Sequence, residues 1–358
     1  MIKSKKFLQH KPIFDQNDAD TVSKIIKSGW VSEGEETEKF QNNYKKFVGA
    51  KYAIATTSGT AAIFLSLIGS GIKPNDEVII PNITFIATAS AVKLAGAKPV
   101  LAEVNEKDFT ISLESVKRKI TKKTKGIIPV HLNGRNTNLD ELIEISDKFN
   151  LKIIEDASQG LGSKYKKKFQ GSIGDVAAFS LAPSKIITTG QGGMITTNNF
   201  KIYDKIKKMK DQGRIDKSEN YKTVGYNFKF TDIQAALGNS QFSKLKNRIK
   251  KLDELYKLYS ELLNKNEFII IPPKEKGNHL WYFDILVKNR NKLEKYLNKN
   301  RIGSRPFNKP LNTRLPYKTK EKFLISKKIC EMGLNLPSHA ELNLEDIEYI
   351  CQKINSVK

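Results

Sequence analysis

The strongest constraint on the fold is a series of short, continuously apolar segments along the first two thirds of the chain. Strands that are covered on both faces have this pattern, whereas half-exposed strands alternate. Candidate helices at 60–70, 86–94, 113–120 and 139–149 lie between several of these segments. This alternation predicts an α/β fold with a mostly parallel seven-stranded sheet between helices. The predicted strands are 51–57 (KYAIATT), 77–81 (EVIIP), 98–104 (KPVLAEV), 125–132 (KGIIPVHL), 151–158 (LKIIEDAS), 176–181 (VAAFSL) and 192–198 (GGMITTN).

The pattern changes at both ends of this region. A first helix is predicted at 18–28, where Gly29 provides a stop. After residue 230 the chain reads as one long helix or two joined helices at 231–262, followed by shorter apolar and helical segments. A length of 358 residues predicts about two domains. We therefore expect an N-terminal arm and large domain at 1–245, and a small C-terminal α+β domain at 246–358. The C-terminal elements are expected at 268–273, 281–287, 291–297 and from about Leu344.

The charge of the chain is strongly positive, at +24 from 62 basic and 38 acidic residues. Of the basic residues, 54 are lysines and eight are arginines, and the lysines are scattered along the chain. Arginine is the better residue for forked contacts to phosphates and bases, so we expect no nucleic-acid partner. The positive charge can instead speed encounters with an anionic substrate.

Other general features argue against membranes, metals and disulfides. No run of about 18 apolar residues is present, and the first residues lack the apolar core of a secretory signal. Cys330 and Cys351 have no disulfide or zinc spacing, and the four histidines form no metal-binding set with carboxylates. We expect a cytoplasmic protein that binds neither membrane nor metal.

Polar groups follow four of the predicted strands at the point where each strand ends. In open α/β sheets, ligands bind beyond the carboxyl ends of the strands. We therefore expect these groups to converge on one edge of the sheet. They are Ser58, Gly59 and Thr60 after the first strand, Thr84 and Phe85 after the second, Asp156 and Gln159 after 151–155, and Ser180 and Lys185 at the end of 176–181.

The residue types suggest a chemistry for each group, with a plain structural alternative. Residues 58–60 at a helix start suit a phosphate, although a simple helix cap has the same pattern. Asp156 can hold a pyridine nitrogen protonated, or can serve as a cap or an ion-pair partner. The Lys185 amine can form a Schiff base with an aldehyde, although most of the 54 lysines belong to the surface. Phe85 can stack on a flat ring or belong to the core.

These residues lie within six segments that resemble one enzyme family. The segments follow in order over 28–238 and resemble the DegT/DnrJ/EryC1/StrS sugar aminotransferases, which are fold-type-I pyridoxal-phosphate enzymes. The similar segments are 28–34 (SGWVSEG), 57–62 (TSGTAA), 80–92 (IPNITFIATASAV), 154–185 (IEDASQGLGSKYKKKFQGSIGDVAAFSLAPSK), 190–198 (GQGGMITTN) and 225–238 (GYNFKFTDIQAALG).

The resemblance implies a Schiff base between pyridoxal 5'-phosphate and Lys185. It places Asp156 on the pyridine nitrogen and Gln159 near the phenolic oxygen. Relatives that dehydrate nucleotide sugars carry histidine at the Schiff-base position. The lysine here therefore favours amino transfer, with the cofactor passing between its pyridoxal and pyridoxamine forms.

The resemblance also implies how the rest of the cofactor is held. Gly59, Thr60 and Ser180 would bind the phosphate, and Phe85 would stack on the ring. Asn227 would reach the phosphate from the neighbouring subunit. The expected active unit is thus a homodimer with shared active sites.

The C-terminal part resembles perosamine synthases, which aminate C4 of a nucleotide-linked 4-keto-6-deoxyhexose. The similar segments are 211–214, 279–287, 305–307, 309–311 and 315–317. The resemblance suggests Trp30, Phe307 and Lys309 as substrate contacts.

Three positions depart from the common family pattern. Asn133 stands where tyrosine is frequent, Lys229 where arginine is frequent and Asn308 where an aromatic residue is common. These departures concern the sugar and the nucleotide rather than the cofactor.

The expected reaction moves the amino group of L-glutamate to C4 of the keto sugar and releases 2-oxoglutarate. The product would be a 4-amino-4,6-dideoxy sugar of the perosamine or viosamine type, used for surface polysaccharides or glycans. Two alternatives stay open. One is an aminotransferase for a 3-keto nucleotide sugar or a keto-inositol, and the other is a basic binding protein without a cofactor.

Overall fold

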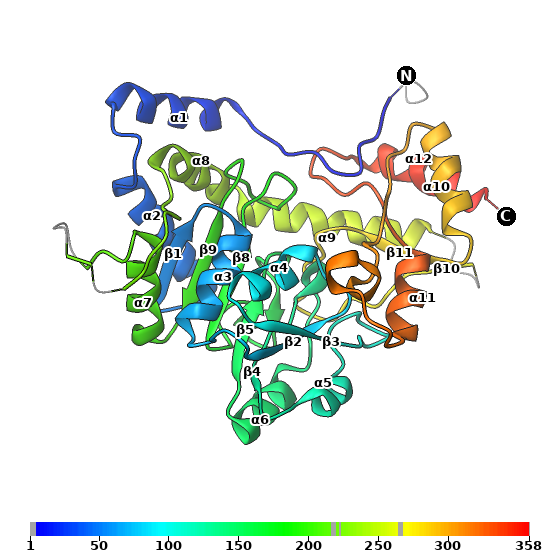
Figure 1. The fold of residues 1–358 in the computed structure, drawn as a ribbon. Coiled ribbons are helices and arrows are strands. Elements are labelled where there is room, and N and C mark those ends of the chain that lie inside the picture. Colours follow the sequence, from blue (N-terminus) through cyan, green and yellow to red (C-terminus); the bar gives the residue numbers. More distant parts are fainter. Residues whose placement is uncertain (1–4, 216–219, 222, 264–267, 358) are drawn as a thin grey trace.

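The computed structural model describes residues 5–215, 220–221, 223–263 and 268–357. Its centre is a seven-stranded sheet of order β1-β9-β8-β5-β4-β2-β3 (Figure 1). Strands β8, β5, β4, β2 and β3 run parallel, and β9 runs antiparallel to both of its neighbours. The predicted fold class is confirmed. The strands are β1 (Tyr52–Thr56), β2 (Glu77–Pro81), β3 (Lys98–Ala102), β4 (Thr124–Ile127), β5 (Lys152–Asp156), β8 (Val176–Ser180) and β9 (Gly193–Thr197).

Helices cover both faces of this sheet. Consecutive strand residues point to opposite faces. Ile54 and Ile80 therefore pack in the core beneath α3, α4 and α7, whereas Ala53 and Ile79 face the layer that includes α2, α5 and α6. This two-sided burial explains the continuous apolar runs. The helices are α1 (Gln16–Ser28), α2 (Glu35–Val48), α3 (Gly59–Gly69), α4 (Ile86–Leu94), α5 (Leu113–Lys119), α6 (Leu139–Phe149), α7 (Phe200–Lys210), α8 (Asp232–Ser243), α9 (Leu245–Leu262), α10 (Arg290–Lys299), α11 (Leu324–Met332) and α12 (Leu344–Asn355).

The C-terminal part forms its own small sheet and apolar core. This sheet has four strands in the order β10-β11-β13-β12, and every pair is antiparallel. Phe7 from the N-terminal segment packs in the same core and forms a bridge to Ile302. The division at residue 245 stays a prediction. The remaining strands are β6 (Lys164–Tyr165), β7 (Lys168–Phe169), β10 (Ile269–Ile270), β11 (Asp284–Val287), β12 (Arg305–Pro306) and β13 (Gly333–Asn335).

Element ends differ from the prediction where proline or a cap intervenes. Strand β4 ends at Ile127 rather than 132, because the apolar run contains Pro129, which has no N–H for a ladder. The strand expected at 268–273 is limited to β10, since two prolines follow. The long helical stretch is two helices that meet at Lys244. The first helix begins two residues early, because the Asp15 side chain caps it.

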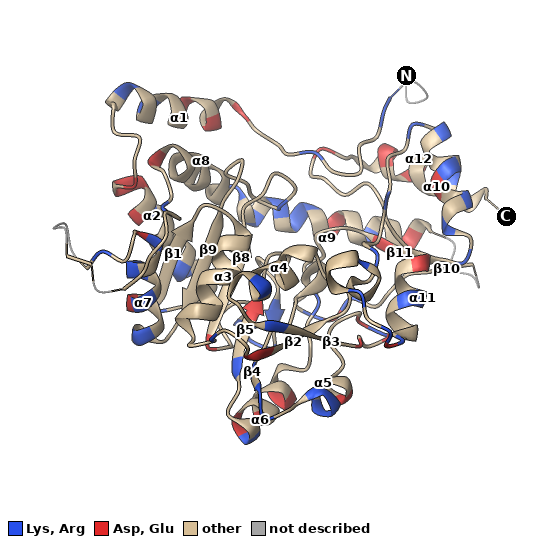
Figure 2. Ribbon diagram, in the orientation of Figure 1, with Lys and Arg blue, Asp and Glu red and all other residues tan. Residues whose placement is uncertain are grey.

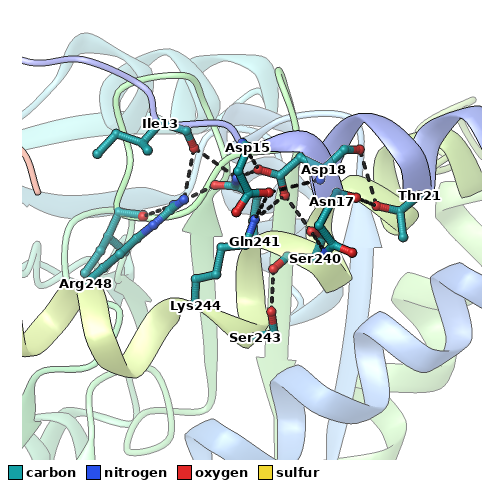
Figure 3. A network of polar contacts seen from close by, with 11 residues as sticks. Ile13, Asp15, Asn17, Asp18, Thr21, Ser240, Gln241, Ser243, Lys244 and Arg248 are labelled. Carbon is teal, nitrogen blue, oxygen red and sulfur yellow. Dashed lines mark hydrogen bonds and ion pairs between the residues drawn. The ribbon is translucent and has the colours of Figure 1, made fainter. Parts of the chain in front are cut away.

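A buried polar network holds helix α1 on helix α8 (Figure 3). The Asp18 carboxylate accepts hydrogen bonds from Ser240 at 2.6 Å, from Gln241 at 2.7 Å and from Lys244 at 2.9 Å. Arg248 donates to the Ile13 carbonyl at 2.9 Å. These contacts fix the N-terminal arm across α8 and the start of α9.

Charged side chains lie on many elements of the surface. In the view of Figure 2, lysines and arginines occur along α5, α6, α7, α9 and α10, with acidic residues between them. Within the described residues, no helix is both long and apolar enough to cross a membrane.

One buried ion pair joins the edge of the large sheet to the small sheet. The Arg135 guanidinium donates two hydrogen bonds of 2.7 Å to the Asp284 carboxylate, and both side chains are at most 2% exposed. Arg135 follows β4, and Asp284 is the first residue of β11. Removing one partner of such a pair leaves a buried charge without compensation.

We predict that Arg135→Met lowers the free energy of unfolding by about 3–5 kcal/mol, measured by chemical denaturation. The matched control is Lys117→Met in the exposed pair Lys117–Glu141, which should leave the free energy of unfolding nearly unchanged because solvent screens this pair. The double variant Arg135→Met with Asp284→Leu should recover most of the loss. A single-variant loss no larger than the control's would contradict the role given to this pair.

Candidate active site

A pocket of about 320 Å³ opens beyond the carboxyl ends of the parallel strands. Its walls come from the large sheet and from the C-terminal sheet. Ten residues proposed from the sequence line it, so the expected convergence is confirmed, while their roles toward ligands stay predictions. These residues are Ser58, Gly59, Thr60, Thr84, Phe85, Asp156, Gln159, Ser180, Lys185 and Phe307.

The N-terminus of α3 forms an anion site in this pocket. The Ser58 hydroxyl accepts the Ala61 N–H at 3.1 Å, so Ser58 is the helix cap. Among the described residues, the N–H groups of Gly59 and Thr60 have no acceptor, as is usual in a first helical turn. A Cβ on Gly59 would lie 2.8 Å from the Cβ of Ser180, so only glycine permits this close approach. Residues 58–60 therefore serve as a helix cap through Ser58 and also offer free N–H donors at Gly59 and Thr60, where an anion can bind.

The Asp156 carboxylate ends strand β5 and is 4% exposed. Its Oδ2 accepts a hydrogen bond from the Thr88 hydroxyl at 2.7 Å, and its Oδ1 accepts from the Ser158 N–H at 3.2 Å. Thr88 in turn lies 2.8 Å from the Thr84 hydroxyl, which must donate because the Thr88 proton is engaged. Asp156 has no ion-pair partner within 4 Å in the described part of the chain. The carboxylate is thus oriented and still free to hold a cationic group.

The Lys185 amine lies in the same pocket. Its Nζ is 4.0 Å from the centroid of the Trp281 ring. Burial, the largest influence, lowers the pKa of Lys185 from 10.5 to about 8. Asp156 opposes this shift and Arg305 adds to it. A substantial part of this amine is therefore neutral near pH 8, as a nucleophile or a general base requires.

Asn133 connects the two walls of the pocket. Its N–H donates to the Gln159 Oε1 at 2.8 Å, which leaves the Gln159 amide hydrogens for a ligand. Its side chain exchanges two hydrogen bonds with the Tyr282 backbone, at 2.7 and 2.8 Å. Asn133 has a φ of 52°, a left-handed conformation that asparagine tolerates well. This departure from the family pattern thus positions the segment that carries Trp281.

His131 and Glu155 form a fully buried pair behind the pocket. The His131 Nε2 lies 2.8 Å from the Glu155 Oε2, and neither residue lines the pocket. Glu155 also accepts the N–H groups of Gly171, Ile173 and Gly174. The pair holds the 171–174 turn under β5, so His131 has a structural role.

Three residues proposed from the sequence lie outside this pocket. Trp30 is 63% exposed, and Lys309 and Asn227 are also exposed. Asn227 forms a backbone bridge to Asp211. Their roles toward substrate or a neighbouring subunit stay predictions. Phe85, in contrast, caps α4 on the pocket wall with 53% of its surface exposed, so it is not a core residue.

Sequence reasoning missed several residues of the pocket. Thr88 orients Asp156, and Trp281, Tyr282 and Arg305 form much of the wall from the C-terminal sheet. The segments with Trp281 and Arg305 were noted only for their resemblance to perosamine synthases. Thr88 left a usable signal, since it lies one helical turn after Thr84.

The chemistry of the pocket fits pyridoxal phosphate. Open N–H groups at a helix N-terminus suit its phosphate, and an oriented carboxylate suits its ring nitrogen. The Lys185 amine suits its aldehyde, and the exposed Phe85 ring suits its flat face. In the described chain, no group of three or more His, Cys, Asp or Glu side chains is placed to hold a metal ion.

Comparison with known proteins agrees with this geometry. The chain is 33% identical over 352 residues to GDP-perosamine synthase from Escherichia coli O157:H7, with 97% of both chains covered. It is 34% identical to GDP-perosamine synthase from Caulobacter vibrioides, covering 97% of this chain and 96% of that one.

Solved structures agree as well. PseC from Helicobacter pylori, an aminotransferase involved in the biosynthesis of pseudoaminic acid, has a TM-score of 0.92 at 26% identity, with 98% of both chains covered. The PLP form of the sugar aminotransferase Spr1654 from Streptococcus pneumoniae has a TM-score of 0.92 at 25% identity, again with 98% of both chains covered.

Residues 12–355 match the DegT/DnrJ/EryC1/StrS aminotransferase family. A match of this length excludes the alternative of a binding protein without a cofactor. The chain therefore belongs to the DegT/DnrJ/EryC1/StrS family and is a pyridoxal-phosphate-dependent sugar aminotransferase.

Proposed function

We propose that the enzyme transfers the amino group of L-glutamate to C4 of a nucleotide-linked 4-keto-6-deoxyhexose. The observation that carries the reaction type is the Lys185 amine, whose pKa is about 8, in a pocket with an oriented carboxylate and an anion site. The preference for C4 is supported by whole-length similarity to GDP-perosamine synthases. Surface-polysaccharide or glycan synthesis in the cytoplasm is the corresponding context.

The residues of the pocket divide the work of the reaction. The cofactor supplies an aldehyde that takes up the amino group and a ring that draws off electrons. Asp156, held by Thr88 and Ser158, keeps the ring nitrogen protonated. The N–H groups of Gly59 and Thr60 bind the phosphate through the dipole of α3.

Lys185 carries the proton of the reaction. In its neutral form the amine takes a proton from the carbon of L-glutamate that bears the amino group. The amine would then deliver this proton to the former aldehyde carbon of the cofactor. Water would supply the ketone oxygen as 2-oxoglutarate leaves, and the nitrogen would stay with the cofactor. The second half-reaction runs the same steps in reverse on the keto sugar.

A second candidate is amination at C3. The chain is 32% identical over 344 residues to dTDP-3-amino-3,6-dideoxy-alpha-D-galactopyranose transaminase from Aneurinibacillus thermoaerophilus, covering 93% of each chain. It is also 29% identical to a UDP-4-amino-4,6-dideoxy-N-acetyl-beta-L-altrosamine transaminase from Campylobacter jejuni. An experiment must therefore identify the nucleotide and the carbon that is aminated. A keto-inositol is tested in the same experiment.

We also propose that two copies form the active unit. Asn227 lies outside the pocket of its own chain and is exposed, as a contact to a neighbour's phosphate would require. Large apolar side chains are exposed in two segments, one just before Asn227 and one between α1 and α2. Val224 is 79% exposed, Trp30 is 63% exposed and Val31 is 43% exposed. Covering such side chains would stabilise a homodimer.

The substrate prediction is tested by absorption spectroscopy of enzyme converted to its pyridoxamine form with L-glutamate. GDP-, UDP- and dTDP-linked 4-keto-6-deoxyhexoses are then added separately. We expect one of them to restore the absorption band of the aldehyde form, and NMR of the product to show nitrogen at C4. Restoration by a 3-keto sugar or a keto-inositol alone would make the C4 proposal wrong.

The role of Lys185 is tested by Lys185→Ala. We expect turnover to fall by at least about 10³-fold, because the nucleophile and the proton carrier are lost together. The matched control is Lys299→Ala at the exposed end of α10, which should retain full activity. Multiple turnovers by Lys185→Ala would rule out the assignment.

The lowered pKa of Lys185 predicts an unusual pH dependence of its reactivity. Only the neutral amine reacts with acetic anhydride, and burial favours that form. In the cofactor-free protein, labelling of Lys185 should reach half its maximum near pH 8, whereas ordinary lysines require about pH 10.4. Peptide mass spectrometry measures both in one sample. Asp156→Asn should move the Lys185 midpoint to lower pH, because Asp156 raises this pKa. A midpoint near that of surface lysines would contradict the environment described for Lys185.

A further inference from the structure

The C-terminal sheet contributes a group of hydrogen-bond donors to the pocket. Arg305 begins β12, and Trp281 and Tyr282 precede β11. Strands β11 and β12 both pair with β13, where Asp284 and Arg305 share Asn335 as their register partner. The pairing therefore brings these three pocket residues to one wall, although more than twenty positions of sequence separate Arg305 from the other two.

The donors of this wall lack acceptors. Within the described residues, the Tyr282 hydroxyl and the Trp281 Nε1 are buried without a hydrogen-bond partner, and Tyr282 and Trp281 are only 5% and 9% exposed. The Tyr282 hydroxyl lies near Ser184 and Arg305 without a hydrogen bond of normal geometry. Burial raises the pKa of Tyr282, so its hydroxyl keeps its proton and can donate. Buried donors are normally satisfied, so an acceptor from a ligand is the expected complement.

The charge of this wall is positive. Arg305 has no carboxylate within ion-pair distance in the described part of the chain. The two carboxylates of the pocket are already engaged, Asp284 with Arg135 and Asp156 with Thr88 and Ser158. A guanidinium with a neighbouring hydroxyl matches a carboxylate, to which arginine can donate two hydrogen bonds.

The location of this wall identifies which carboxylate fits. The Trp281 ring lies 4.0 Å from the Lys185 Nζ and stacks on Tyr282, and the charge of Arg305 acts on the Lys185 amine. An anion bound here therefore lies beside the reacting carbon. In an amino acid, the α-carboxylate is bonded to the carbon that loses its amino group. In a nucleotide-linked hexose, the diphosphate is attached across the ring from C4.

We propose that Arg305, together with the Tyr282 hydroxyl, binds the α-carboxylate of the amino-acid donor. This assignment rests on the proposed use of L-glutamate. It makes Arg305 a residue that determines donor specificity, distinct from the anion site at the N-terminus of α3. Asn133 serves this site as a positioning residue, because its two hydrogen bonds hold the Tyr282 backbone.

The test separates the two half-reactions of the holoenzyme. Arg305→Gln should raise the L-glutamate concentration for half-maximal conversion by about 10- to 100-fold, the effect of losing a charged hydrogen bond. The keto-sugar half-reaction should change by less than about threefold, because its anion lies elsewhere. Arg305→Lys should raise this L-glutamate concentration less, because lysine keeps the positive charge but lacks the paired N–H donors of the guanidinium. Arg118→Gln on the exposed face of α5 removes the same charge and should change neither half-reaction.

A binding measurement gives a second readout that needs no turnover. Glutarate carries carboxylates but no amino group, and calorimetry measures its affinity for the holoenzyme. Arg305→Gln should weaken glutarate binding at least about tenfold, and Tyr282→Phe should weaken it to a smaller extent. Arg118→Gln should bind glutarate as the unmodified enzyme does. Tyr282→Phe, which removes only the hydroxyl, keeps the proposal testable even if Arg305→Gln fails to fold.

The outcomes distinguish this proposal from the proposed function. The inference would be overturned if Arg305→Gln left the L-glutamate dependence and the glutarate affinity unchanged but required more keto sugar. Arg305 would then bind the nucleotide diphosphate. Absence of glutarate binding by the unmodified enzyme would overturn it as well. If no keto sugar accepts the amino group, the proposed sugar substrate is wrong, while the L-glutamate and glutarate measurements still decide the role of Arg305.

Discussion

The pocket exists because the small C-terminal sheet is held against the edge of the large sheet. The Arg135–Asp284 pair is a buried contact between them, and each of its charges is stable there only while the other compensates it. The uncharged Asn133 side chain also links the two parts, through two hydrogen bonds with the Tyr282 backbone. Asn133 and Arg135 lie within three residues of each other in the segment after β4. This short segment therefore helps to position Trp281 relative to Lys185.

Lys185 shows how the surroundings make one lysine chemically distinct. Its side chain is the same as that of 53 other lysines, and its burial beside Trp281, helped by the charge of Arg305, lowers its pKa to about 8. Asp156 limits the shift, because a nearby carboxylate favours the charged amine. The amine is therefore balanced between a form that attacks and a form that donates a proton, as a group that works in both directions requires.

The half of the pocket on the large sheet could be predicted from sequence, and the other half could not. Parallel strands end at one edge, so Gly59, Asp156 and Lys185 are recognisable from the strand pattern alone. Trp281 and Arg305 meet only through the register of β11, β13 and β12, and no local pattern encodes this pairing. Trp30 and Lys309 also lie in similar segments but outside the pocket of this chain, and their roles toward substrate stay predictions.

The pocket must keep its cofactor while substrates enter and leave, and its two anion sites differ in a way that suits this. The N-terminus of α3 binds through backbone donors and a dipole, which suits a group that stays in place. Arg305 binds through a side chain that is exposed to solvent, which suits a group that must leave. Arg305 also lowers the pKa of Lys185. A carboxylate that neutralised Arg305 would relieve this effect, so the donor would raise the basicity of Lys185 at the step in which the amine takes its proton.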